Sequence, residues 1–235
     1  IDVRLVGSEM CIRDRIYSEF DKAKFYSLED GVDIAMKSST AKFNETIDIA
    51  INVNVDPKKG EQNVRGKIQL PKSLGKVIKV CVFANADKQE EAKEAGADLV
   101  GGDELVEKVK AGFTDFDRCI STPDMMAKVG KLGQVLGPRG LMPNPKLGTV
   151  TANVKKAVED AKAGELEYKT NGIVIHSGVG KSKFNKAELV SNIKFFVETI
   201  SKDRPAGIKG DFIKGVSISP TMGPGIKLDL GSLSI

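Results

Sequence analysis

The chain has 235 residues, of which 40% are hydrophobic and 29% charged, and its formal net charge is +4. These values are typical of a globular protein with one large or two ordinary domains, and they exclude an intrinsically disordered chain. The mildly basic balance permits an RNA partner but does not require one, because the distribution of charge matters more than its sum. The three cysteines lie far apart and form no Cys-x-x-Cys pair, so we expect no zinc site, no disulfide framework and no cofactor. No apolar run approaches the length of a membrane span, so we expect no membrane partner.

The first residues are unlike the rest of the chain. Residues 1–15 show neither helical nor strand periodicity, and their acidic and basic side chains cancel. We therefore interpret residues 1–15 as a non-native or disordered leader and exclude them from the fold prediction.

A helix and two strands are predicted next. Ser27 and Asp30 have the spacing of a helix N-cap with an acidic partner. Apolar residues alternate with mostly polar ones from Ile47 to Val55, which predicts a half-buried strand. Residues 64–70 predict a second, weaker strand.

The pattern then changes to that of a parallel sheet. Residues 77–84 are nearly all apolar, which is typical of a strand covered on both faces. Further segments follow in alternation: a helix over 87–95, a strand over 98–100, a helix over 103–111, a strand over 117–121 and a helix over 124–136. This alternation predicts a small parallel α/β unit.

Residues 130–150 form a stretch rich in glycine and proline. Pro138, Pro143 and Pro145 exclude a regular helix or central strand across its tip, so we predict a shaped loop. Between Asp124 and Glu159 there is no acidic residue, whereas this interval contains six basic ones: Lys128, Lys131, Arg139, Lys146, Lys155 and Lys156. Such a loop suits a surface that meets phosphates, although an ordinary solvated connection fits the composition equally well.

The alternating pattern returns after a helix predicted over 154–161. Asn171-Gly172 is a strong hairpin signal between a strand near Tyr168 and a partner strand at 173–175. The remaining predicted elements are a helix over 189–200, a strand over 212–219 and a last strand over 226–230.

The predicted fold class combines α/β and α+β structure in two domains. Residues 16–72 and 164–235 are expected to form a discontinuous α+β domain, with a split β-α-β arrangement and an antiparallel sheet. Residues 73–163 are expected to form an inserted, three-layer, Rossmann-like α/β domain. Chain termini that meet in one domain fit such an insertion.

Two features resemble enzyme chemistry but are incomplete. Gly178-Val179-Gly180-Lys181-Ser182 is similar to the end of a phosphate-binding loop, yet the glycine required five positions before Gly180 is Ile175. His176 is the only histidine, and the chain has no Gly-x-Ser-x-Gly elbow. We interpret His176 as a strand-end residue that makes a hydrogen bond. The chain is therefore not expected to be an enzyme, and a nucleotide-dependent enzyme built on the inserted domain is the alternative.

Two other loops carry groups that RNA recognition uses. Residues 40–43 supply a hydroxyl, a cation and an aromatic ring, and residues 221–225 place a hydroxyl beside glycines that let backbone approach a partner. The structural alternatives are a core position for Phe43 and a tight strand connection at 221–225.

Several segments resemble, in order, the bacterial form of the L-one family of large-subunit ribosomal proteins. The segments include Thr40-Ala41-Lys42-Phe43-Asn44-Glu45-Thr46, Thr122-Pro123-Asp124-Met125-Met126, Gly137-Pro138-Arg139-Gly140-Leu141-Met142-Pro143-Asn144-Pro145-Lys146 and Ser219-Pro220-Thr221-Met222-Gly223-Pro224-Gly225. The resemblance covers about residues 20 to 231.

The resemblance implies a cytoplasmic protein that binds the mobile stalk of 23S-type rRNA in the large subunit, without catalysis. It also implies help with release of tRNA from the exit site, repression of its own operon mRNA, and a monomeric state off the ribosome. The implied rRNA-binding residues are Thr40, Lys42, Phe43, Ser217, Ser219, Thr221, Met222 and Gly223. Weaker RNA contacts are expected at Arg139, Lys146, Lys169 and His176.

Overall fold

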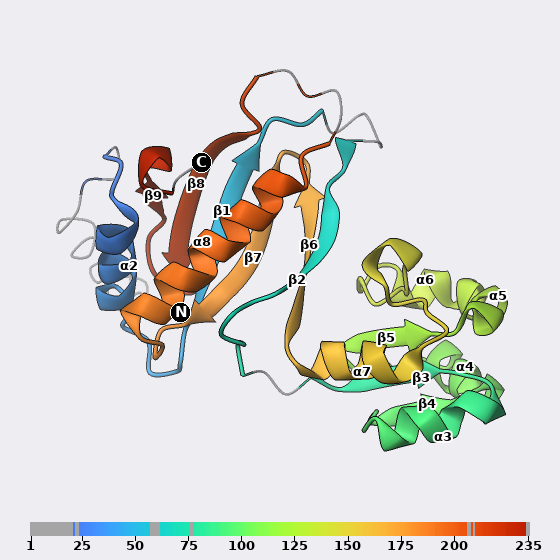
Figure 1. Cartoon of the computed structure of the whole chain (residues 1–235). Coiled ribbons are helices and arrows are strands. Elements are labelled where there is room, and N and C mark those ends of the chain that lie inside the picture. The colour runs from blue at the N-terminus through green and yellow to red at the C-terminus, as the bar shows by residue number, and fades with distance from the viewer. Residues whose placement is uncertain are drawn as a thin grey trace, which may run out of the picture. The chain divides into compact units, whose positions relative to one another are not determined.

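The computed structural model describes residues 21, 24–56, 62–75, 78–205, 208 and 210–233. The predicted leader and the first residues of the predicted rRNA-binding domain lie outside this range. The chain divides into two compact units. The first unit comprises Ile1–Leu74 and Leu166–Ile235, and the second comprises Gly75–Glu165 (Figure 1).

An antiparallel sheet forms the centre of the first unit. Its strands, in spatial order, are β2 (Arg65–Gln69), β6 (Glu165–Asn171), β7 (Val174–Lys181), β1 (Thr46–Val53), β8 (Ile213–Pro220) and β9 (Ile226–Leu228). β1 pairs with β7 on one side and β8 on the other, antiparallel in both cases. The predicted antiparallel sheet is confirmed.

Helices α2 (Leu28–Lys37) and α8 (Lys186–Lys202) pack on one face of this sheet (Figure 1). Ser27 caps α2 as predicted, because its Oγ accepts the Asp30 N–H at 3.3 Å. Every second residue of β1 points into the core beneath these helices: Ile47, Ile49, Ile51 and Val53. The residues between them point to the opposite side of the sheet, which we call the open face.

The second unit is built on a parallel sheet, as predicted. β3 (Val80–Phe83) lies between β4 (Leu99–Gly101) and β5 (Arg118–Ser121), parallel to both. Cys81 and Phe83 pack in one apolar cluster with α4 (Asp103–Lys110), whereas Val80 and Val82 pack in another with α3 (Ala86–Glu94) and α7 (Val154–Lys162). Helices thus cover both faces of a sheet whose central strand is completely buried.

The prediction of one helix over 124–136 is wrong in detail. Four short segments occupy this region: the 3-10 helix η2 (Pro123–Met125), α5 (Met126–Val129), the 3-10 helix η3 (Gly130–Leu132) and α6 (Gly133–Leu136). Gly130 and Gly133 have low helix propensity and occupy the segment boundaries, so the hydrogen-bond pattern alternates between tight and normal turns.

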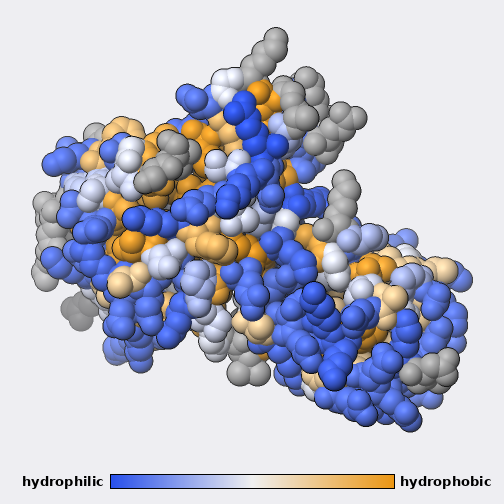
Figure 2. Space-filling model, in the orientation of Figure 1, coloured by the Kyte–Doolittle hydropathy of each residue, from blue (hydrophilic) through white to orange (hydrophobic). Residues whose placement is uncertain are grey.

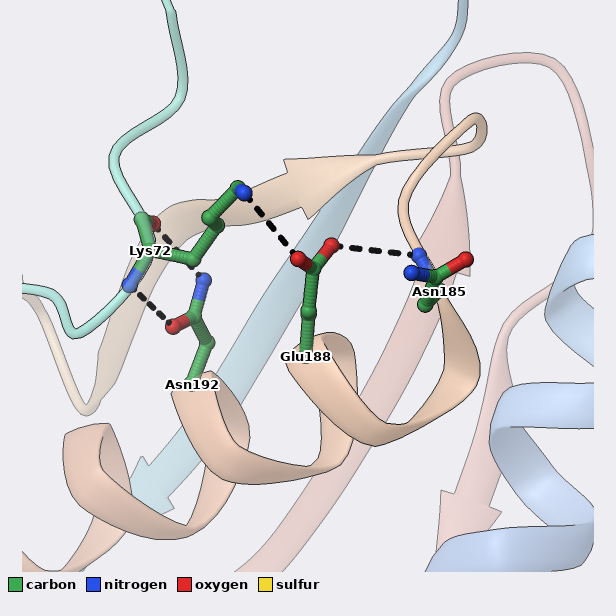
Figure 3. A network of polar contacts seen from close by, with 4 residues as sticks. All are labelled: Lys72, Asn185, Glu188 and Asn192. Atoms are coloured by element: carbon green, nitrogen blue, oxygen red, sulfur yellow. Dashed lines mark hydrogen bonds and ion pairs between the residues drawn. The ribbon is translucent and has the colours of Figure 1, made fainter.

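A polar network holds the chain leaving the first unit against α8 (Figure 3). The Asn192 side chain is fully buried; its Oδ1 accepts the Lys72 N–H at 3.1 Å, and its amide donates to the Lys72 carbonyl at 3.0 Å. The same amide donates to the Val179 carbonyl in β7 at 2.8 Å. The Glu188 carboxylate adds an ion pair with Lys72 Nζ at 3.0 Å and accepts the Asn185 N–H at 3.3 Å. Residue 72 is therefore fixed to the core of the first unit.

Hydrophilic side chains cover most of the surface seen in Figure 2, with apolar residues showing between them. None of the helices in the described part of the chain has the length and apolar character needed to cross a bilayer.

Candidate nucleic-acid interface

A buried carboxylate joins two loops at one end of β1. Glu45 is completely buried, and its Oε1 accepts the Ala41 N–H at 2.9 Å. Its Oε2 accepts the Met222 N–H at 3.0 Å. We call these two contacts the Glu45 clamp. Since hydrogen bonds to an ionised acceptor are stronger than neutral ones, the clamp fixes the loop after α2 to the turn after β8.

The turn after β8 is attached to β1 at a second point. Thr221 Oγ1 accepts the Thr46 N–H at 3.0 Å and donates to the Thr46 carbonyl at 3.1 Å. Lys181 Nζ donates to Thr46 Oγ1 at 2.7 Å. The Thr221 hydroxyl, predicted from the sequence to contact RNA, thus holds its own turn in place.

Both loops present an apolar side chain to solvent. Phe43 is 55% exposed and Met222 is 66% exposed, so the alternative of a core position for Phe43 is excluded. Residues 221–225 do form the tight connection between β8 and β9, but that connection carries Met222 outward. At Gly223 a Cβ would lie 2.3 Å from Pro220 Cγ and 3.4 Å from the Ser38 carbonyl oxygen, so no larger residue fits without a shift.

Ser217 and Ser219 lie on the open face of β8, leading into this turn. Their register partners in β1 are Ala50 and Asp48. Burial raises the pKa of the Asp48 carboxyl, and the nearby charges of Lys181 and His176 oppose that rise. This stretch of the sheet thus combines small side chains, hydroxyls and one carboxylate.

His176 and Lys169 belong to the neighbouring hairpin. His176 is exposed on β7 with Ala50 as its register partner, and it lies within the strand, so its interpretation as a strand-end residue is wrong. Lys169 is exposed on β6. The structure therefore places His176 and Ser217 in one row across the sheet, two strand spacings apart, since both pair with Ala50.

Arg139 and Lys146 belong to the second unit. Arg139 is exposed and its guanidinium donates to Thr114 Oγ1. Lys146 lies in the 3-10 helix η4 (Pro145–Leu147), and its side chain is outside the described part of the structure.

The loop around these two residues is shaped by glycine, as predicted. Gly140 and Gly148 have φ of 72° and 68°, values that favour glycine. Leu141 and Met142, however, pack against the apolar cluster of the second unit. This part of the motif is structural, and the exposed part lies around Arg139.

The residues that resemble a phosphate-binding loop are in a strand. Gly178 and Gly180 lie in β7 and pair with β1, so their backbone is part of the sheet. Among the described residues, no group of three or more His, Cys, Asp or Glu side chains is arranged to hold a metal ion.

The family model described as the Ribosomal protein L1p/L10e family matches residues 35–224. The chain belongs to this family. The match contains both loops of the Glu45 clamp and every predicted rRNA-binding residue. The resemblance stated from the sequence motifs is confirmed. The L1p/L10e family consists of structural, rRNA-binding proteins of the large ribosomal subunit and is not an enzyme family.

Sequence reasoning did not assign a role to Glu45, although this residue lies within a recognised motif. Its two N–H donors belong to residues 4 and 177 positions away along the chain. A signal was present, because Glu45 is in phase with the apolar residues Ile47 and Ile49, and that spacing places its side chain on the core side of the sheet.

Proposed function

We propose that this chain binds the mobile stalk of 23S-type rRNA through the loop at 40–45 and the turn at 221–223. The single observation that carries the proposal is the Glu45 clamp. It fixes the loop bearing Phe43 to the turn bearing Met222, so two exposed apolar side chains are held on ordered backbone. An ordered surface of this kind limits the entropy that is lost when a partner binds.

The chemistry of this surface suits recognition of RNA by shape. Phe43 and Met222 offer apolar contact to a sugar or an unpaired base. Gly223 lets the turn pack tightly against Pro220 and Ser38. Lys42 is exposed and supplies a charge to phosphates, which gives binding its salt dependence. Thr40 adds a hydroxyl group in the same loop, and Ser217 and Ser219 add hydroxyl groups on the open face of β8.

The two parts of the chain have separate roles in this proposal. Residues 16–72 and 164–235 form the rRNA-binding domain, since both loops and the open face belong to the first unit. Residues 73–163 form an inserted domain, which adds weaker RNA contacts through Arg139 and Lys146. Lys169 and His176 add weaker contacts from the hairpin of the rRNA-binding domain.

Membership of the L1p/L10e family supports further roles. We propose that the chain is a monomer off the ribosome and works in the cytoplasm as part of the large subunit. There it assists release of tRNA from the exit site. It also represses translation of its own operon mRNA, through an RNA segment that imitates the rRNA site.

The test is binding to a stalk-sized fragment of large-subunit rRNA, with an RNA duplex as control, across a salt series. We expect tight binding that remains selective for the stalk fragment as the salt concentration rises. Phe43→Leu should weaken it, whereas Phe195→Leu, at a 40% exposed position on α8, should not. Weak binding that is equal for both RNAs and lost with salt would refute the proposal.

A further inference from the structure

A second exposed aromatic ring lies at the edge of the same sheet. Tyr26 forms a parallel bridge with Leu228, donates its N–H to the Lys227 carbonyl at 3.0 Å, and accepts the Asp229 N–H at 2.9 Å. The segment before α2 thus extends the sheet beyond β9. Tyr26 packs on the core, whereas Phe25, its neighbour in the chain, is 62% exposed.

The geometry of β9 places Phe25 on the open face. Ile226 and Leu228 are buried in the core, so Lys227 between them points to the opposite side. Lys227 Nζ lies over the Phe25 ring, 5.9 Å from its centroid. A lysine ammonium in this position attracts the negative face of the ring and keeps the two side chains together.

Phe25 and Lys227 continue a row of residues that crosses the open face. Lys227 pairs with Ser217, Ser217 with Ala50, and Ala50 with His176. The row therefore places a lysine and a histidine at its ends and two small side chains between them. Three strand spacings give it a span of about 14 Å, which is the length of roughly four stacked nucleotides at ~3.4 Å each.

We infer that Phe25 and Lys227 extend the RNA-binding surface across the open face to the edge of the sheet, where Phe25 stacks on an unpaired base and Lys227 contacts a phosphate. The inference rests on the proposed function, because this row shares Ser217 with that site and β8 leads directly into the 221–223 turn. An unpaired RNA segment fits better than a duplex, since an aromatic ring can stack only on a base that is out of its helix.

The charges and sizes of the neighbouring side chains support this partner. Ala50 and Ser217 are small side chains at the centre of the row, and the row itself carries only cationic or neutral side chains. Asp48, in the adjacent row, is the acidic residue of β1 on this face, and Lys181 and His176 lie near enough to reduce its repulsion. A lysine on an edge strand can simply prevent pairing with another chain. That role would explain Lys227, but it would not explain the exposed aromatic ring of Phe25 beside it.

The test compares two variants with two matched controls, all assayed with the stalk rRNA fragment across a salt series. The variants are Phe25→Leu and Lys227→Gln. The controls are Phe195→Leu and Lys194→Gln on α8, which covers the opposite face of the sheet. All four positions are exposed, and denaturant unfolding of each variant checks that the fold is unchanged.

We expect Phe25→Leu to lower affinity by about tenfold, because base stacking is lost, and Phe25→Tyr, which keeps an aromatic ring, to bind like the unsubstituted chain. Lys227→Gln should reduce the slope of log affinity against log salt by about one unit. The two α8 controls should bind like the unsubstituted chain, and binding to a duplex should not respond to Phe25.

The outcomes separate this inference from the proposed function. If Phe43→Leu weakens selective binding while Phe25→Leu and Lys227→Gln behave like the controls, the inference is overturned and the proposed function stands. Equal losses for stalk fragment and duplex in Phe25→Leu would also overturn it. If Phe43→Leu too leaves selective binding unchanged, both are refuted.

Discussion

Replacing Glu45 by glutamine should loosen the clamp without changing the size of the buried side chain. The carboxylate accepts one N–H on each oxygen, from Ala41 and Met222. A glutamine oxygen can still accept one of them, but its NH2 group would face the other donor. Leaving one of these partly buried N–H groups without an acceptor costs about 1–3 kcal/mol. Glu45→Ala leaves both donors without this acceptor and adds a cavity, so its cost should be about 2–5 kcal/mol.

RNA affinity should fall with the clamp, because only the joined arrangement of the two loops presents Phe43 and Met222 together. If the lost 1–3 kcal/mol reduces the population of that arrangement, affinity falls by up to about 5- to 150-fold. The assay pairs denaturant unfolding with stalk-RNA titration below the unfolding transition. Glu198→Gln, at an exposed position of α8, is the matched control. Equal unfolding midpoints and equal affinities for Glu45→Gln and Glu198→Gln would refute the reasoning.

Three further changes test other parts of the structure. Asn192→Asp should lower the free energy of unfolding by about 3 kcal/mol, because a buried carboxylate would replace the amide that donates to two carbonyls; denaturant unfolding measures it. Burial and the hydrogen bond to the Asp203 carboxylate raise the pKa of Tyr168, so its stabilising effect is complete below about pH 10 and is lost as pH rises through its folded-state pKa. The difference in tyrosinate absorbance between the unsubstituted chain and Tyr168→Phe reports the ionisation of Tyr168. In a pH titration, this difference should develop at a higher pH than the absorbance of a free tyrosine. Burial also raises the pKa of the Asp48 carboxyl in the folded state. The contribution of Asp48 to the free energy of unfolding is therefore fully present below about pH 4 and is lost as pH rises through that raised pKa. Asp48→Asn should accordingly increase stability at pH 7, and removing this negative charge should strengthen RNA binding. A weaker RNA affinity in Asp48→Asn would contradict the placement of RNA on the open face.

Local patterns in the sequence were sufficient to predict a strand or hairpin where the burial of each residue depends only on its position along that element. The alternation from Ile47 onward predicted β1, since each second residue lies in the core. The Asn171-Gly172 signal predicted the hairpin correctly, and Gly172 adopts a φ of 64°. The parallel strand β3 was evident for the opposite reason, because all four of its residues are buried.

The predictions were less accurate where distant partners decide the structure. The partner strand was predicted over only 173–175, yet β7 continues to Lys181. Its later residues include Gly178 and Gly180, which favour a loop when read locally. They lie in a strand because β1 pairs with them along its length. Likewise, no local pattern could reveal that the Glu45 carboxylate meets the N–H of Met222.

The separation between the core and the open face suggests how the two parts of the proposed surface differ. On the open face, the Phe25 and Lys227 side chains have little part in the core, so substitutions of these two residues should change RNA affinity and leave the free energy of unfolding nearly constant. Glu45 is different, because the same two hydrogen bonds order the loops and stabilise the fold. Substitutions at the clamp should therefore lower both RNA affinity and stability, whereas substitutions of Phe25 or Lys227 should lower RNA affinity alone. Measuring both quantities for each variant distinguishes a residue that contacts RNA from one that positions the contact.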